Sequence, residues 1–158
     1  MAEHGIHITQ QPNFTYTLEG RYADNLDGWR LAHNNPLRGP MDAGIKVALS
    51  SDILPIGPMV GLYAATTRKG MSGKVYGPDE AITLQEALRG YTLTSAFINF
   101  DENIKGSLEA GEYADMIVLP GNLLATPEEE LMAMEVQQTY LQGELVYQRT
   151  AKGAQTQQ

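Results

Sequence analysis

The alternation of hydrophobic and polar positions predicts two short β-strands in the first third of the chain. Residues 6–10 alternate apolar and polar side chains and stop at Pro12, as a short strand does. Residues 45–49 form a brief apolar run, which is typical of a strand covered on both faces. A short helix is predicted over residues 36–43, ended by Gly44. A strand–helix–strand unit crosses over in a right-handed sense, so the two strands should pair in parallel.

The segment that connects the two strands lacks a regular apolar pattern, whereas the segment after the second strand has one. Residues 13–35 show no sustained period and are punctuated by glycine and asparagine, so we expect a long loop with one helical turn near Trp29. Residues 58–68 carry apolar residues at helical spacing, which predicts an amphipathic helix. We expect Tyr63 to pack in the core and Arg68 to form a surface ion pair.

The clearest helix start lies at Thr83, three residues before Glu86. In such a capping box the threonine oxygen accepts a hydrogen bond from the backbone of the glutamate, whose side chain reaches back. The pattern predicts a helix over residues 84–93, with a further helical turn over residues 94–100.

Turns and short strands are predicted in the last third of the chain. The apolar run at residues 116–119 indicates a strand, and residues 136–141 and 144–147 indicate a hairpin around Gln142 and Gly143. A second capping box is predicted at residues 126–129. Asp115 is expected to shape this module through a hydrogen bond to the backbone.

These elements predict an α/β chain whose sheet is incomplete. The expected parts are an α/β segment over residues 1–104, a small β-rich module over 105–149 and a flexible tail over 150–158. Two parallel strands do not make a stable sheet by themselves. The missing neighbours must come from a longer protein or from other copies of the chain, so we expect completion by self-association or by a partner fragment.

Composition narrows the class of protein and its possible partners, but it does not indicate a specific function. The chain has 158 residues, 42% of them hydrophobic and 19% charged, which fits one globular unit of ordinary composition. A net charge of −8, with the 11 Lys and Arg residues scattered, argues against a nucleic-acid partner. Cysteine is absent, which excludes disulfides and thiolate chemistry. Prolines and glycines interrupt the longest apolar stretch, so no membrane span is expected. No signal-peptide pattern opens the chain, and we expect a cytoplasmic protein.

Four segments resemble the amidohydrolase superfamily, in particular its amidohydrolase-3 branch, which includes the N-substituted formamide deformylases. The most specific is residues 105–119, where Gly106-Ser107, Gly111 and Ala114-Asp115 follow the pattern with which the family closes its polypeptide. The others are Ser50-Ser51-Asp52 with Pro55, residues 58–68 and residues 84–92. The glycine that usually precedes the Ser-Asp pair is Ser50 here.

The resemblance implies the C-terminal portion of a (β/α)₈ barrel hydrolase, the TIM-barrel type. Residues 6–10 would be its seventh strand and residues 45–49 its eighth, with Asp52 just past the carboxyl end, where such barrels place their chemistry. In the family this aspartate binds the metal and takes the proton from the attacking water. The family also has a Gln-Pro pair at the rim of its pocket, so Gln11 is the candidate substrate-binding residue.

The departures from the family concern the metal. Its His-x-His pair, bridging ligand and two later histidines all lie upstream of the seventh strand, and a complete barrel needs about 250 residues. The only histidines here are His4, His7 and His33, with no His-x-His motif. We therefore expect no cofactor in this chain alone, and zinc or another divalent metal in a complete family member.

Each candidate also has a structural reading. Asp52 is alternatively a polar residue that ends a strand, and Gln11 a residue that positions a loop. We expect His4 and His7 on opposite faces of a strand, which argues against a metal-binding pair, and His33 in a loop.

Three functional hypotheses follow. The first is the terminal portion of a metal-dependent amidohydrolase acting on non-peptide C–N bonds, catalytically incomplete without an N-terminal fragment. The second is a non-catalytic module that oligomerises or binds a partner through its exposed sheet edges. The third is an enzyme whose site is rebuilt between subunits, where Asp52 meets a histidine of another copy.

Overall fold

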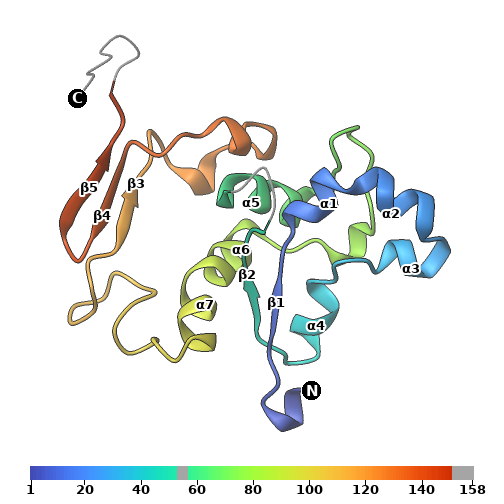
Figure 1. The fold of residues 1–158 in the computed structure, drawn as a ribbon, viewed down its shortest axis with the longest axis horizontal. Helices are drawn as coiled ribbons and strands as arrows, with labels where there is room; N and C mark the ends of the chain where they lie inside the picture. The colour runs from blue at the N-terminus through green and yellow to red at the C-terminus, as the bar shows by residue number, and fades with distance from the viewer. Residues whose placement is uncertain (53–56, 151–158) are drawn as a thin grey trace.

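The computed structural model of this protein describes residues 1–52 and 57–150. The described residues form a two-stranded sheet and a separate three-stranded sheet. In Figure 1 the two-stranded sheet lies in the middle of the molecule with helices on both sides, and the three-stranded sheet lies at one end. Within the described ranges, no helix is long and apolar enough to cross a membrane. The predicted tail lies almost wholly outside these ranges, and the boundaries drawn at residues 104 and 149 stay predictions.

The central strands form the parallel pair that the sequence predicts. After a short 3₁₀ turn, η1 (Ala2–His4), β1 (Ile8–Gln10) pairs with β2 (Val47–Leu49), and Ile8 lies opposite Val47. All three residues of β2 are buried, which agrees with a strand covered on both faces. Each strand has its other edge unpaired within the described residues, because this sheet contains only β1 and β2.

Four short helices connect the two strands: α1 (Asn13–Thr17), α2 (Glu19–Asn25), α3 (Gly28–Ala32) and α4 (Arg38–Asp42). The prediction of a long loop over residues 13–35 was therefore wrong. The helices that replace it have five to seven residues, too few to show a full amphipathic period. Isolated helices of this length are unstable in water, so tertiary contacts such as those of α1 with α5 (Pro58–Thr67) must hold them.

Helix α5 is buried on every side. Its residues 61–66 are all buried, because α1, the next long helix and a C-terminal 3₁₀ helix surround it. The prediction that residues 58–68 form a helix is confirmed, but the amphipathic character was wrong, since a helix packed all round needs no polar stripe. Arg68 follows the last helical residue as the C-terminal cap, and its φ of 55° lies in the left-handed region.

The predicted capping box is present. After the 3₁₀ turn η2 (Pro78–Glu80), α6 (Leu84–Tyr91) begins with Thr83 accepting from the Glu86 amide at 3.2 Å and the Glu86 carboxylate accepting from the Thr83 amide at 2.8 Å. Helix α7 (Leu93–Ile98) follows directly, as expected. The hydrophobic core lies between these helices and the strands, and it contains Leu37, Val47, Leu49, Leu62, Ala65, Ile82 and Ala87.

The C-terminal module is an antiparallel sheet in the order β3 (Met116–Val118), β4 (Gln138–Leu141), β5 (Glu144–Gln148). The predicted hairpin is confirmed, and its turn residues Gln142 and Gly143 both have positive φ, as a tight two-residue turn requires. The predicted role of Asp115 is also confirmed, because its Oδ1 accepts a hydrogen bond from the Gln142 amide at 2.8 Å.

The second capping box was wrong. Two 3₁₀ helices, η3 (Leu123–Ala125) and η4 (Glu128–Ala133), connect β3 to β4. Helix η4 has Pro127 as its N-terminal cap and no side-chain cap bond. The Thr126 hydroxyl donates backwards to the Asn122 carbonyl at 3.0 Å, and Glu129 forms an ion pair with Lys69 at 3.3 Å instead of folding back.

Candidate functional site

The candidate site lies where the carboxyl ends of β1 and β2 meet. Because the strands are parallel, Gln11 after β1 and Ser50 after β2 come out at the same edge, and Gln11 Nε2 donates to Ser50 Oγ at 3.3 Å. Asp52 lies two residues further along the chain and is exposed. The structure thus brings the segment of Gln11 next to the segment of Asp52, while their roles in binding and catalysis stay predictions.

A partly buried polar cluster contacts the chain at Ser50, Ser51 and Gly57, near Asp52. Asn13, the first residue of α1, is fully buried, and its Nδ2 donates to the Gly57 carbonyl at 3.3 Å. Ser51 Oγ accepts from the Gly57 amide, also at 3.3 Å. The hydroxyl of Tyr91, the last residue of α6, lies 3.4 Å from both Asn13 Oδ1 and the Ser50 carbonyl. Burial raises the pKa of Tyr91 to about 12, so the hydroxyl stays a hydrogen-bond donor at neutral pH.

The described residues do not form a metal site by themselves. Among them no group of three or more His, Cys, Asp or Glu side chains could hold a metal ion. His7 lies just before β1, at the opposite end of the sheet from Asp52, so these two residues of one chain cannot share an ion. One exposed carboxylate does not hold a divalent cation, and the other ligands of any metal at Asp52 must come from outside these residues.

Two of the three histidines, His4 and His7, are placed differently from the prediction. His4 ends η1 and His7 precedes β1, so neither lies in the strand, because the left-handed Gly5 ends the 3₁₀ turn between them. The rings of His7 and Phe97 pack edge-on, with their centroids 5.3 Å apart. The Nζ of Lys46 lies 4.2 Å from the centroid of the Phe97 ring. His33 lies in the turn that follows α3, as expected, and its ring stacks on the exposed Trp29 ring at 4.4 Å.

Arg68 is buried, and the predicted surface ion pair was wrong. Its side chain donates to three backbone carbonyls: Nε to Tyr76 at 3.0 Å, and the terminal nitrogens to Asn35 at 3.0 Å and Asn34 at 2.7 Å. Burial lowers its pKa to about 10, against an opposing effect of the buried Glu80. Tyr63 is in the core, as predicted, with its ring edge-on to that of Tyr16.

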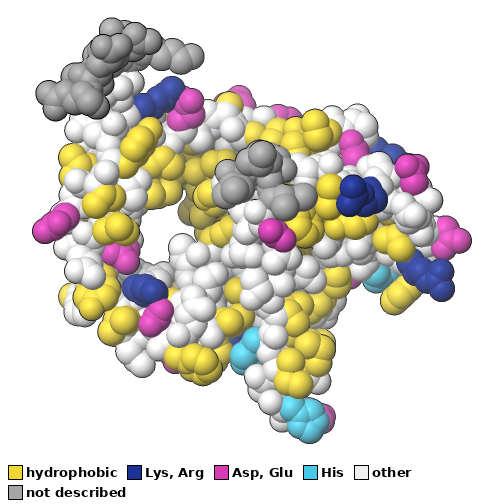
Figure 2. All heavy atoms as spheres, viewed as in Figure 1, with side chains coloured by type: hydrophobic (Ala, Val, Ile, Leu, Met, Phe, Trp, Pro, Cys, Tyr) yellow, Lys and Arg dark blue, Asp and Glu magenta, His cyan; other side chains and the backbone are white. Residues whose placement is uncertain are grey.

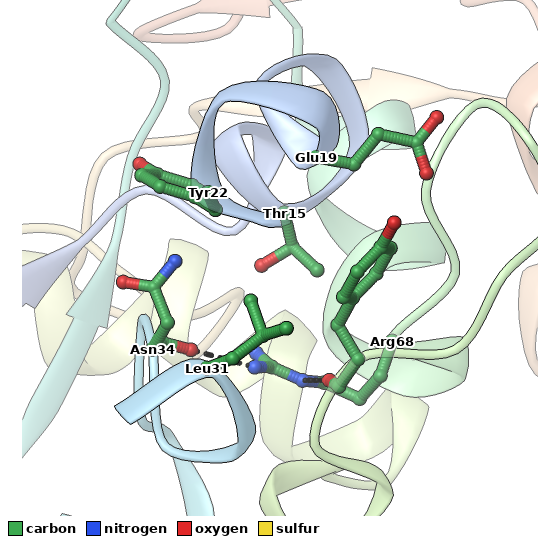
Figure 3. Close-up of a pocket in the computed structure, with 7 residues that line it drawn as sticks. Thr15, Glu19, Tyr22, Leu31, Asn34 and Arg68 are labelled. Atoms are coloured by element: carbon green, nitrogen blue, oxygen red, sulfur yellow. Dashed lines mark hydrogen bonds between the residues drawn. The ribbon is translucent and has the colours of Figure 1, made fainter. Parts of the chain in front are cut away.

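Figure 3 shows the small cavity beside Arg68, lined by side chains of α1, α2 and α3. Its volume is about 10 Å³, which is enough for one water molecule and no larger ligand. Arg68 follows the ten-residue α5, roughly 15 Å along the helix from Pro58 beside the candidate site. The cavity is therefore a structural feature and not an extension of that site.

A much larger hollow separates the three-stranded sheet from the helices. Its volume is about 700 Å³, and Figure 2 shows it as an opening between the sheet and the rest of the molecule. Apolar side chains from both sides line it, among them Met59, Leu62, Leu88, Met116, Ile117 and Leu123. Sequence reasoning did not find this hollow, because its walls come from segments far apart along the chain.

Known proteins resemble this chain over almost its whole length. The model of the amidohydrolase family matches residues 1–147. The chain belongs to the amidohydrolase family. It is 34% identical to the N-substituted formamide deformylase of Arthrobacter pascens over 158 aligned positions, which cover 95% of this chain but 28% of that protein. The family prediction is confirmed, and so is the expectation that the chain corresponds to only a portion of such a protein.

Solved amidohydrolase-like structures share the fold. A metal-dependent hydrolase from Pyrococcus horikoshii superposes with a TM-score of 0.67 at 23% identity, covering 81% of this chain and 27% of that chain. The guanine deaminase of E. coli gives a TM-score of 0.60 at 18% identity, covering 94% and 36%. At these identities the likeness shows the fold alone, and the α/β class is thereby confirmed.

Proposed function

We propose that this chain is the C-terminal portion of a metal-dependent amidohydrolase that hydrolyses non-peptide C–N bonds, and that it is not catalytically complete alone. The observation that carries the proposal is Asp52 at the carboxyl end of a parallel strand pair, in a family member that spans 28% of its relative's length. A carboxylate in that position would accept a proton from an attacking water and pass it to the leaving nitrogen. Gln11, one strand away, would contact the substrate.

The outer edges of β1 and β2, which have no strand partner within residues 1–52 and 57–150, support a barrel origin. Parallel strands that are buried on both faces occur in sheets with helices around them, and β2 is buried in this way. In the proposed barrel, β1 and β2 are the seventh and eighth strands, and their outer edges would pair with strands of the missing polypeptide. That polypeptide would also bring the remaining ligands of a zinc or other divalent ion.

The exposed C-terminal sheet supports the need for a further layer. All residues of β3 and β5 are exposed, including Ile117, Val146 and Tyr147. A sheet normally buries at least one face against another layer, and unpaired edges recruit strands. The same exposure favours a second candidate function, a module that self-associates through this sheet.

A chimaera tests the first proposal. This chain replaces the matched 28% of the Arthrobacter pascens deformylase, and metal content and hydrolysis of an N-substituted formamide are measured. We expect stoichiometric metal and turnover, lost by at least about a thousandfold in Asp52→Asn, because the carboxylate acts on the reacting water. Asp79→Asn, which removes an exposed carboxylate in η2, is the matched control and should keep full activity.

The isolated chain distinguishes the second candidate. Its mass in solution is measured by light scattering together with its metal content. A metal-free oligomer without hydrolytic activity, combined with a folded but inactive chimaera, would favour the self-associating module. A monomer that holds stoichiometric metal would contradict both candidates.

A further inference from the structure

We propose that Tyr91 and Asn13 are positioning residues for Asp52, acting through the backbone that flanks it, an inference that rests on the proposed function. Asp52 is exposed, so packing of its own side chain does not fix its place. A catalytic carboxylate has to be held within about 0.5 Å of its working position. The chain on either side of it must therefore supply the restraint.

Contacts on both sides of Asp52 lead to the same two residues. On the N-terminal side, the Tyr91 hydroxyl lies 3.4 Å from the Ser50 carbonyl. On the C-terminal side, Asn13 Nδ2 donates to the Gly57 carbonyl at 3.3 Å. The Tyr91 hydroxyl also lies 3.4 Å from Asn13 Oδ1, which links the two anchors. Helix α1 thus contacts the chain at Gly57 and α6 contacts it at Ser50, while the Gly57 amide donates to Ser51 Oγ, next to Asp52, at 3.3 Å.

Gly61 provides independent support for the close approach of the Tyr91 hydroxyl to Asn13. It lies in the buried middle of α5, where glycine is less favourable than alanine by about 1 kcal/mol. A Cβ at this position would lie 1.8 Å from the Tyr91 oxygen and 2.7 Å from Asn13 Oδ1. The glycine therefore makes room for the hydroxyl and the amide to meet over α5.

The test removes one oxygen. Tyr91→Phe keeps the ring and deletes the hydroxyl, while Tyr63→Phe removes the hydroxyl of another buried tyrosine and serves as the matched control. In the isolated chain, we expect the Gly57 amide to exchange with deuterium about two- to fivefold faster in Tyr91→Phe, because Asn13, which binds Gly57, loses its 3.4 Å contact with the Tyr91 hydroxyl. In the chimaera, kcat should fall about tenfold while KM and metal content stay within about twofold.

Asn13→Asp provides a second variant, because it keeps the size and the acceptor but loses the amide donor to Gly57. It should lower kcat in the same way without changing KM. Equal kcat for wild type, Tyr91→Phe and Asn13→Asp in an active chimaera would overturn the positioning role alone, and so would an equal loss in Tyr63→Phe. An inactive wild-type chimaera that folds and binds metal would instead refute the proposed function, and the positioning role with it.

Discussion

Replacing Gly61 by alanine tests the packing beneath the candidate site without any need for activity. At an ordinary helix position this change stabilises a protein by about 1 kcal/mol. Here the new methyl group would meet the Tyr91 oxygen at 1.8 Å, the Tyr91 Cζ at 2.8 Å and Asn13 Oδ1 at 2.7 Å. None of these distances is tolerated without movement, and overpacking of a core costs about 1–3 kcal/mol. We therefore expect Gly61→Ala to lower the free energy of unfolding by up to about 2 kcal/mol.

Combining Gly61→Ala with Tyr91→Phe shows how much of the destabilisation comes from the contact with the Tyr91 hydroxyl. Phenylalanine has no hydroxyl, so the shortest of the three contacts disappears while the other two remain. The destabilisation by Gly61→Ala should then be smaller by about 1 kcal/mol, which a double-mutant cycle in urea measures as a shift of the midpoint at constant slope.

Gly20→Ala is the control for the Gly61 substitution. Gly20 lies in α2, and nothing lies within 4 Å of a Cβ built there, so alanine should stabilise the chain by up to about 1 kcal/mol. If Gly61→Ala stabilised the chain as Gly20→Ala does, or cost the same with and without the Tyr91 hydroxyl, the close approach over α5 would be refuted.

Two further predictions concern Glu86 and Arg68. The hydrogen bonds from Arg38 lower the pKa of Glu86 from 4.5 to about 2, so its contribution to stability is complete above about pH 4.5 and is lost as the pH falls toward 2. Glu86→Gln should therefore flatten the pH dependence of the unfolding midpoint between about pH 4.5 and pH 2. An unchanged pH dependence would show that the Arg38–Glu86 pair does not cause it. Arg68→Met should lower the free energy of unfolding by about 3 kcal/mol, because one buried and two partly buried carbonyls lose their donor. Chemical denaturation measures this loss, and a change below about 1 kcal/mol would contradict the role of these bonds.

Local signals predicted those elements that neighbouring residues determine. The capping box at Thr83 and the hairpin turn at Gln142 depend on residues close in sequence. For Asp115 the sequence predicted a hydrogen bond to the backbone but not its partner, Gln142, which lies 27 residues further along the chain. The helices α1 and α2 were missed because they are too short for a period and are held by tertiary contacts, whereas the helical turn expected near Trp29 corresponds to α3. The burial of Arg68 was missed for a related reason, since its partners are carbonyls that only the fold brings within reach.

The candidate site was predictable only in part. Asp52 and Gln11 were found through the family resemblance, and the parallel pairing of their strands follows from the chain order. Tyr91 and Asn13 are 78 residues apart in sequence, and no local pattern connects them. One signal existed nevertheless: a glycine inside an apolar helical run usually has a packing reason, and Gly61 was such a residue.

Glu86 both caps α6 and binds Arg38, and this affects the position of Tyr91 at the other end of the helix. The carboxylate closes the first turn of α6 and also receives both terminal nitrogens of Arg38 from α4, at 2.9 and 2.6 Å. Helix α6 has eight residues, a stiff rod about 12 Å long, and Tyr91 is its last residue. A tilt at the acidic end would swing the phenol at the far end away from Ser50. Protonation of the Glu86 carboxylate would thus loosen a helix whose last residue contacts the Ser50 carbonyl, two residues before Asp52.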